Sequence, residues 1–365
     1  MNASPSKLQS RMTPLAARFV LALFAATTVF FVAVTFSPLK SGYADAPSRG
    51  PGDAALYRAE IQRIQAGESY YQAADVELRE RGYPTRSVFN WRMPLPVWLI
   101  GILPDAALGQ ALLGSLSLAL LVLGFALVSD EGTVRQGVLS ALLLSGALLP
   151  ILLGELFVMP ELWSGVCIAL SVAAYGTGRR RLGFASGFAA LVLRELAAPY
   201  CLVCGLLALK ERRWREVAAW TLGLVAYLGY LAFHIAQVRP LIGPNDVAHT
   251  QGWVQFGGAG FVISTVQMNA YLLLLPQWVT AIYFALALVG FAGWTSQAGQ
   301  RAGITAALFV VAFSFVGQSF NQYWGSMTAP LMCLGVARSF GTLKDLWQAA
   351  RVSRLDSSVQ QPAAV

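Results

Sequence analysis

Long apolar segments recur along this chain of 365 residues. The first, from Phe19 to about Ser37, has the length of roughly 20 residues that a helix needs to cross a bilayer. Hydrophobic residues make up 56% of the chain and charged residues only 12%, whereas about a quarter of a soluble globular domain is charged. Because lipid offers no water to backbone polar groups, such segments must satisfy their own hydrogen bonds. We therefore predict an all-α fold, a polytopic transmembrane helix bundle of about eight to ten membrane segments.

Basic residues in short clusters beside the apolar segments set the predicted topology. Lys7, Arg11 and Arg18 precede the first span, which places the N-terminus inside the cell. The later spans are then Ala106–Val128, Val138–Leu153, Leu162–Tyr175, the run 182–209, Val217–Val238, Tyr271–Gly293, Ile304–Phe320 and Met327–Val336. We predict one transmembrane domain over residues 1–365, in an inner or plasma membrane, with a cytoplasmic tail at 338–365 and both termini cytoplasmic. The net charge of +8 is thus explained by topology, and we predict the lipid bilayer and no nucleic acid as a partner.

The run 182–209 has basic clusters on both sides, Arg179–Arg181 before it and Lys210–Arg215 after it. If both clusters are inside, the run enters and leaves the membrane on one face. It would then be a re-entrant hairpin of two half-helices, with Arg194, Glu195 and Pro199 at the bend. A single span with one basic flank on the wrong side stays open as the alternative.

The loop at 38–94 is the largest extracytoplasmic segment. Apolar residues recur at helical spacing from Ala54 to Gln65, and Gly67 ends that pattern. A second polar helix is predicted from Gln72 to Arg81. Asp53 then falls at or near a helix N-cap, which is one sufficient explanation for an aspartate there.

Acidic residues on the predicted outer face are the candidates for chemistry. They are Asp53, Glu155 and Glu161, and the intramembrane Arg194 and Glu195 could approach them from below. Ionisable groups are costly at such depths, which marks them as functional candidates. An acid that deprotonates a hydroxyl, with an arginine that holds a phosphate, is the minimal set for transfer from a phosphate-activated donor.

Each of these residues also has a structural explanation. Glu155 and Glu161 suit solvated turns, and Arg194 with Glu195 suits a buried ion pair. His249, in a second outer loop, is placed for substrate contact. The outer aromatics, listed as Trp91, Trp253, Tyr323 and Trp324, suit either sugar stacking or interfacial anchoring.

No metal site is predicted. Cys201 and Cys204 form a CxxC pair, but no second pair or nearby histidine completes a ligand set. No certain cofactor follows from the sequence. A divalent metal held by carboxylate oxygens stays open as an alternative, although no closely spaced pair of aspartates is present.

The outer loop carries a recognisable pattern. It begins Gly52-Asp53-Ala54-Ala55-Leu56-Tyr57 and runs through Gly67-Glu68-Ser69-Tyr70-Tyr71 to Arg92-Met93-Pro94. With Glu161-Leu162-Trp163-Ser164-Gly165 and Leu193-Arg194-Glu195, it resembles the integral-membrane glycosyltransferases of the GT-C superfamily over residues 15 to 215. That family includes protein mannosyltransferases and aminoarabinose transferases, which use polyprenyl-phosphate-linked sugars. No second acid stands beside Asp53 here.

The resemblance implies an enzyme, an inverting membrane glycosyltransferase of the cell envelope. Asp53 matches the family's essential acid and would accept a proton from an acceptor hydroxyl, while Arg194 and Arg92 would lie near the donor phosphate. The expected partners are a polyprenyl-phosphate-linked sugar donor and an acceptor that could be a glycan, lipid or protein. A transporter or flippase for a lipid-linked or small polar substrate, and a non-catalytic transferase-like membrane protein, remain the alternatives.

Overall fold

The computed structural model describes residues 12–37, 52–248, 252 and 254–351. It is built of α-helices, and within these residues the only β-pairing is one isolated antiparallel bridge between Val254 and Val316. The predicted all-α membrane bundle is confirmed. The α-helices are α1 (Pro14–Phe36), α2 (Asp53–Gln65), α3 (Tyr70–Glu80), α4 (Leu95–Gly101), α5 (Ala106–Asp130), α6 (Val134–Leu148), α7 (Pro160–Gly176), α8 (Arg180–Leu193), α9 (Ala198–Lys210), α10 (Trp214–Val238), α11 (Gly258–Val266), α12 (Ala270–Leu273), α13 (Gln277–Gly293), α14 (Gln297–Phe315) and α15 (Ala329–Arg351).

Short 3₁₀ segments mark the breaks between these helices. They are η3 (Val88–Asn90), η4 (Leu149–Ile151), η5 (Leu156–Val158), η6 (Glu195–Ala197), η7 (Arg239–Leu241) and η8 (Ser319–Met327). Five helical stretches are long and apolar enough to cross a membrane within the described residues: 14–36, 106–130, 134–151, 214–241 and 297–315. Of the other predicted spans, Leu162–Tyr175 lies in the shorter α7, Tyr271–Gly293 covers α12 and α13, and 182–209 is a broken pair. Met327–Val336 falls in η8 and the first part of the longer α15.

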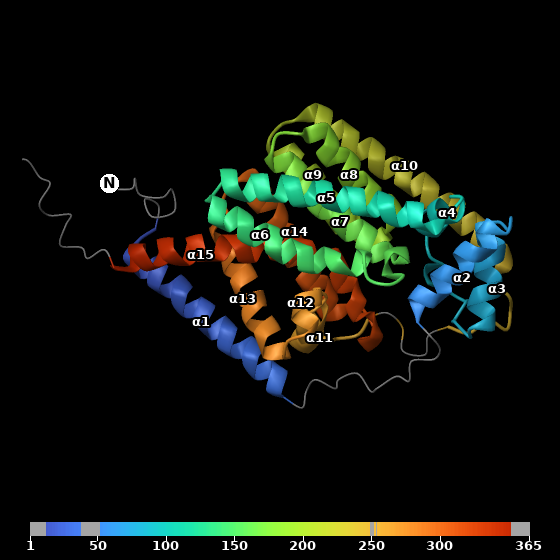
Figure 1. The fold of residues 1–365 in the computed structure, drawn as a ribbon, viewed down its shortest axis with the longest axis horizontal. Coiled ribbons are helices and arrows are strands. Elements are labelled where there is room, and N and C mark those ends of the chain that lie inside the picture. Colours follow the sequence, from blue (N-terminus) through green and yellow to red (C-terminus); the bar gives the residue numbers. More distant parts are fainter. Residues whose placement is uncertain (1–11, 38–51, 249–251, 253, 352–365) are drawn as a thin grey trace, which may run out of the picture.

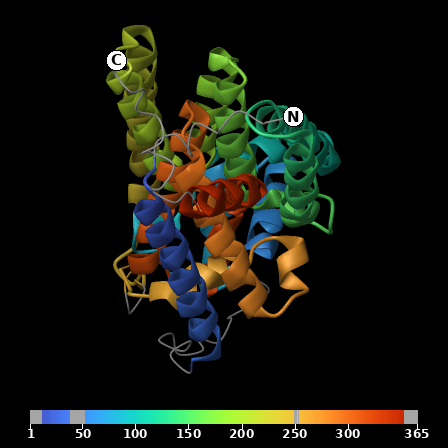
Figure 2. The ribbon, with the colours of Figure 1, turned by 90° about the vertical axis from the view of Figure 1, so that its left-hand side faces the viewer.

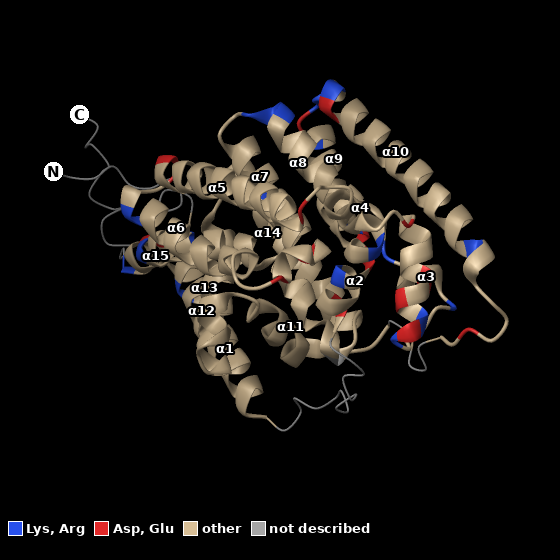
Figure 3. Cartoon of the chain, turned by 45° about the vertical axis from the view of Figure 1, so that its right-hand side comes forward, with Lys and Arg blue, Asp and Glu red and all other residues tan. Residues whose placement is uncertain are grey.

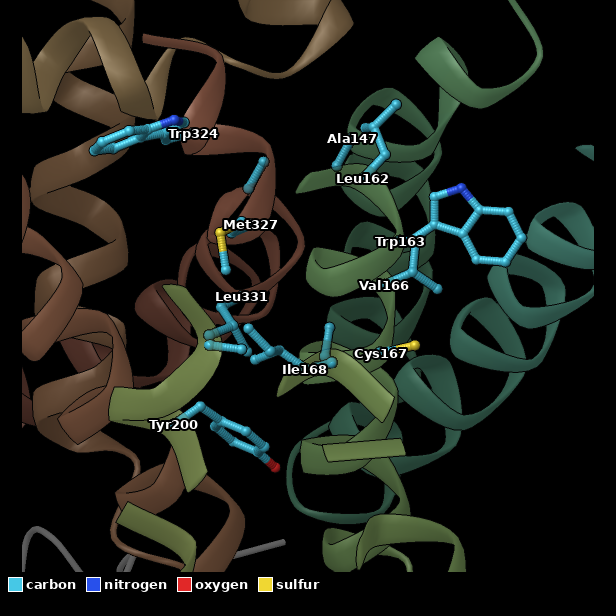
Figure 4. Close-up of a cluster of buried hydrophobic side chains, with 14 of the residues drawn as sticks. Ala147, Leu162, Trp163, Val166, Cys167, Ile168, Tyr200, Trp324, Met327 and Leu331 are labelled. Atoms are coloured by element: carbon cyan, nitrogen blue, oxygen red, sulfur yellow. The ribbon is translucent and has the colours of Figure 1, made fainter. Parts of the chain in front are cut away.

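Helix α7 is the centre of the bundle (Figure 1). Its Leu162 and Trp163 belong to a buried hydrophobic cluster (Figure 4). Its residues from Pro160 to Tyr175 are all buried, because α5, α8, α14 and η8 pack around it. At Gly165 a Cβ would lie 2.3 Å from the main-chain oxygen of Ser326, so only glycine allows η8 to pack this closely on α7. This contact fixes η8 relative to the first turn of α7.

Helix α1 lies along α13 and α15 at one edge of the bundle and also contacts α11 (Figures 1 and 2). Only 6% of its most apolar 18-residue segment is buried inside the protein. Large side chains such as Phe19, Phe30 and Phe36 point outward. In a membrane protein this is the surface expected to face lipid.

The run 182–209 folds as a re-entrant hairpin. Nη1 of Arg180, at the start of α8, lies 3.8 Å from Oε2 of Glu216, near the start of α10. The chain that leaves α9 therefore returns to the end of the bundle at which α8 began. Pro199, in the first turn of α9, helps to explain the break, since a proline inside a continuous helix would remove a hydrogen bond and clash with the preceding turn.

Charged residues gather at helix ends and around α2 and α3, while the long helices are mostly uncharged along their length (Figure 3). Helix α15 runs unbroken past Arg338, where the sequence places the start of the tail. His249, Trp253, residues 38–51 of the outer loop and the tail beyond Arg351 lie outside the described residues.

Candidate active site

Asp53 is the first residue of α2, and two tyrosine hydroxyls hold its carboxylate. The Tyr83 hydroxyl donates to Oδ1 over 2.9 Å and the Tyr323 hydroxyl donates to Oδ2 over 2.6 Å. The N-cap is Gly52, whose φ of 83° lies in the left-handed region that glycine adopts readily. Asp53 therefore lies next to the N-cap, within the predicted range. Instead of capping α2 the Asp53 side chain reaches across to the turn after α3 and to η8.

Arg92 approaches the same carboxylate from the segment before α4. Its Nη2 lies 3.8 Å from Oδ2 of Asp53, and its Nε donates to the Tyr57 hydroxyl over 3.1 Å. The main chain at this position is anchored, because the Tyr70 hydroxyl donates to the Arg92 carbonyl over 2.6 Å. Arg92 is thus positioned by α2 and α3 together, and its side chain is only 14% exposed.

The hydroxyls around Asp53 stay protonated and can donate. Burial raises the pKa of Tyr83 well above its usual value, and the nearby charge of Asp53 raises it further. A neutral phenol beside a carboxylate donates a charge-assisted hydrogen bond, which fixes the orientation of the acceptor. Asp53 therefore presents its carboxylate in one defined direction.

A second cluster consists of Glu161 and Arg194, which are almost completely buried, and the partly exposed Glu195. Nε of Arg194 lies 2.9 Å from Oε1 of Glu161, and Nη1 lies 2.7 Å from Oε1 of Glu195. Glu161 belongs to the first turn of α7, after Pro160, and Arg194 lies at the break between α8 and η6. Nη2 of Arg194 has no hydrogen-bond partner although it is buried. A buried guanidinium with an open donor can receive an anionic group.

The two clusters lie within electrostatic range of each other. Burial raises the pKa of Tyr57, Arg92 opposes this rise, and the charges of both Asp53 and Glu161 add to it. The phenol of Tyr57 therefore senses a carboxylate from each cluster. Three carboxylates, Asp53, Glu161 and Glu195, and two guanidiniums, Arg92 and Arg194, make up the combined site.

Glu155 takes no part in this constellation. Its side chain is 57% exposed and forms an ion pair with Arg58 at the surface. By contrast, Glu161 has no exposed surface, so the interpretation as a solvated turn residue applies to Glu155 and not to Glu161. His249 lies outside the described residues.

The described residues do not fit a metal ion. No group of three or more His, Cys, Asp or Glu side chains with metal-binding geometry occurs among them. The carboxylates of Asp53 and Glu161 instead face tyrosine hydroxyls and guanidiniums. A cavity of about 150 Å³ lies elsewhere, between α1, α11 and α13, and its lining includes Thr35, Ser264 and Gln277.

Sequence reasoning missed the tyrosines that orient Asp53. Tyr323 stood out only as an outer aromatic, although its hydroxyl reaches Asp53 from 270 residues along the chain. Trp91 and Trp324 are only 2% and 3% exposed and belong to the core. The predictions that they stack on a sugar or anchor the protein at the membrane interface are therefore wrong. The sequence alone does not indicate that a tyrosine in an outer turn belongs to the site, because only the tertiary structure shows which carboxylate its hydroxyl binds.

No protein-family model and no curated protein sequence matches this chain. Two solved structures are similar to it: crystal structures of ArnT from Cupriavidus metallidurans, one in the apo state and one bound to undecaprenyl phosphate. The identities are 18% and 15%, with TM-scores of 0.46 and 0.47. Each comparison covers 94% of this chain and 62% of the ArnT chain, so this chain spans less than two thirds of that protein.

ArnT is a GT-C glycosyltransferase. This is the superfamily that residues 15 to 215 of the chain resemble.

Proposed function

We propose that this protein is a membrane glycosyltransferase that moves a sugar from a polyprenyl-phosphate-linked donor to an acceptor hydroxyl on the extracytoplasmic face. The observation that carries the proposal is the carboxylate of Asp53, which two tyrosine hydroxyls orient beside Arg92. A carboxylate fixed in this way suits a general base, which must meet the proton of its substrate in a defined geometry.

The guanidinium groups provide the complementary half of the chemistry. Arg92 lies next to Asp53, and Arg194 keeps an unpartnered Nη2 inside the protein. Guanidiniums bind phosphate oxygens through paired, charge-assisted hydrogen bonds. In this scheme Arg92 and Arg194 hold the phosphate that links the sugar to the lipid. They also stabilise the charge that grows on that phosphate as the sugar leaves.

The transfer step balances without a redox partner. The acceptor oxygen forms a bond to the anomeric carbon while the bond from that carbon to the phosphate oxygen breaks. The electron pair of the broken bond stays on the lipid phosphate, and the proton of the acceptor hydroxyl passes to Asp53. Direct displacement of this kind inverts the anomeric centre.

The test is transfer of radiolabelled hexose from a polyprenyl-phosphate-linked donor in membranes that contain Asp53→Asn. The amide removes the base and keeps the size of the side chain, so we expect activity to fall about 100- to 10,000-fold. The matched control is Asp105→Asn, an exposed N-cap of α5 whose Oδ1 accepts from the Ala107 amide. Asparagine caps a helix as well as aspartate does, so this control should keep its activity. Normal transfer by the Asp53→Asn protein would refute the proposal.

A further inference from the structure

A second site candidate lies at the end of the bundle where both arms of the α8–α9 hairpin terminate, the face predicted to be cytoplasmic. A cavity of about 720 Å³ opens there between the first turns of α8 and α10. Four arginines and one glutamate are among its lining residues: Arg180, Arg181, Arg213, Arg215 and Glu216. The charged lining therefore carries a net charge of +3, four positive charges less one negative.

Three guanidiniums lie close to the single carboxylate of Glu216. Arg180, Arg213 and Arg301 each place a nitrogen 3.8 Å from one of its carboxylate oxygens. That distance is longer than a hydrogen bond. Arg213 also pairs with Glu211, whose Oε2 lies 3.0 Å from its Nε. Arg180 and Arg301 form no other ion pair within the described residues, so their positive charges are only partly compensated.

Arg301 is a buried arginine whose positive charge is also only partly compensated by Glu216. Its side chain is 2% exposed, its guanidinium stacks 3.9 Å above the ring of Tyr175, and its Nε has no hydrogen-bond partner. Tyr175 also lines the cavity. Buried positive charge therefore lies directly behind the wall of the cavity.

Arg181 and Arg215 are free to take a ligand. Both are exposed, and neither forms an ion pair within the described part of the chain. Beside them the cavity is lined by Phe184 and by Trp214, which is 65% exposed. Guanidiniums next to exposed aromatic surface at a bilayer interface match a ligand with a phosphate and an apolar chain.

We propose that this cavity binds the phosphate headgroup of an anionic phospholipid from the cytoplasmic leaflet. Arg181 and Arg215 contact the phosphate, Arg180 and Arg213 supply the field around it, and the acyl chains lie along Phe184. The bound lipid joins the start of α8 to the start of α10. It thereby closes the open end of the hairpin whose bend carries Arg194.

The experiment titrates the purified full-length protein in detergent with phosphatidylglycerol or phosphatidylcholine and counts bound lipids by native mass spectrometry. We compare Arg181→Gln/Arg215→Gln with the control Arg135→Gln/Lys344→Gln, which removes two exposed charges from α6 and α15. Each arginine near a lipid headgroup contributes about fivefold, so phosphatidylglycerol should bind the first variant roughly 30-fold more weakly. The control should bind it like the unaltered protein.

Two results would overturn the proposal. One is equal weakening in both variants, which would mean that only the overall positive field attracts the lipid. The other is equal binding of phosphatidylglycerol and phosphatidylcholine together with binding of inorganic phosphate in a parallel titration, which would mean a soluble anion site. The assay contains no sugar donor, so its outcome is independent of the proposed transfer activity.

Discussion

The ion pair between Glu161 and Arg194 offers the sharpest test of the buried site. Replacing Glu161 with Gln removes a charge from a pair whose side chains are 1% and 2% exposed. Arg194 would then keep only Glu195, whose side chain is 29% exposed. Removing one partner of a buried pair costs about 3–5 kcal/mol, because the other charge stays buried without compensation. Since Glu195 remains, we expect the lower end, about 3 kcal/mol.

This cost converts into a measurable change in melting temperature. Unfolding entropies of about 2.1 cal/mol/K per residue give about 0.8 kcal/mol/K for 365 residues. Glu161→Gln should therefore lower the melting temperature by about 4 °C. A thiol-reactive fluorescent dye can follow unfolding in detergent, because Cys167, Cys201, Cys204 and Cys333 are all buried and free.

The matched control is Glu155→Gln. It removes the same charge from the surface pair with Arg58, in which both side chains are more than one third exposed. Exposed pairs contribute about 0–1 kcal/mol, so this control should shift the melting temperature by about 1 °C or less. The double variant Glu161→Gln/Arg194→Gln removes both buried charges and should lose less stability than the sum of the two single variants. Equal melting temperatures for Glu161→Gln and Glu155→Gln would refute the buried arrangement.

Three further predictions follow from the site and its supports. Burial, reinforced by the charge of a neighbouring glutamate, raises the pKa of Glu60 to about 8. The folded state therefore holds an extra proton between about pH 4.5 and 8, and stability falls as pH rises through that window by up to about 5 kcal/mol. Glu60→Gln should flatten the decline of melting temperature from pH 5 to 8, and an unchanged slope would count against this assignment. Tyr323→Phe removes one donor to Asp53, worth about 1.5–3 kcal/mol, so kcat should fall about 10- to 100-fold with little change in KM for the donor; a change confined to KM would contradict the orienting role. Gly165→Ala forces η8 away from α7 at the Ser326 carbonyl, which should cost about 1–3 kcal/mol in thermal unfolding and lower the rate of sugar transfer; full stability would show that the contact is looser.

Much of the fold could be predicted because membrane segments follow from local composition. The limits of α5 and α10 agree closely with the predicted spans, since the length of an apolar run and the charged residues at its ends set where such a helix begins and ends. The hairpin at 182–209 was one of two predictions, and a single ion pair between Arg180 and Glu216 decided it. The continuity of α15 past Arg338 could not be foreseen, because a basic residue ends a membrane segment without ending a helix.

The candidate site divides in the same way. The sequence by itself determined which acids and arginines are unusual, because Asp53 opens a polar helix and Arg194 interrupts an apolar run. Tertiary structure alone decided that Tyr83 and Tyr323 orient Asp53 and that Glu161 pairs with Arg194. The local sequence shows where a charged residue falls within an apolar segment, and therefore where its burial costs free energy. The partner that compensates for that charge comes from segments far away in the chain, and only packing brings them within hydrogen-bond distance.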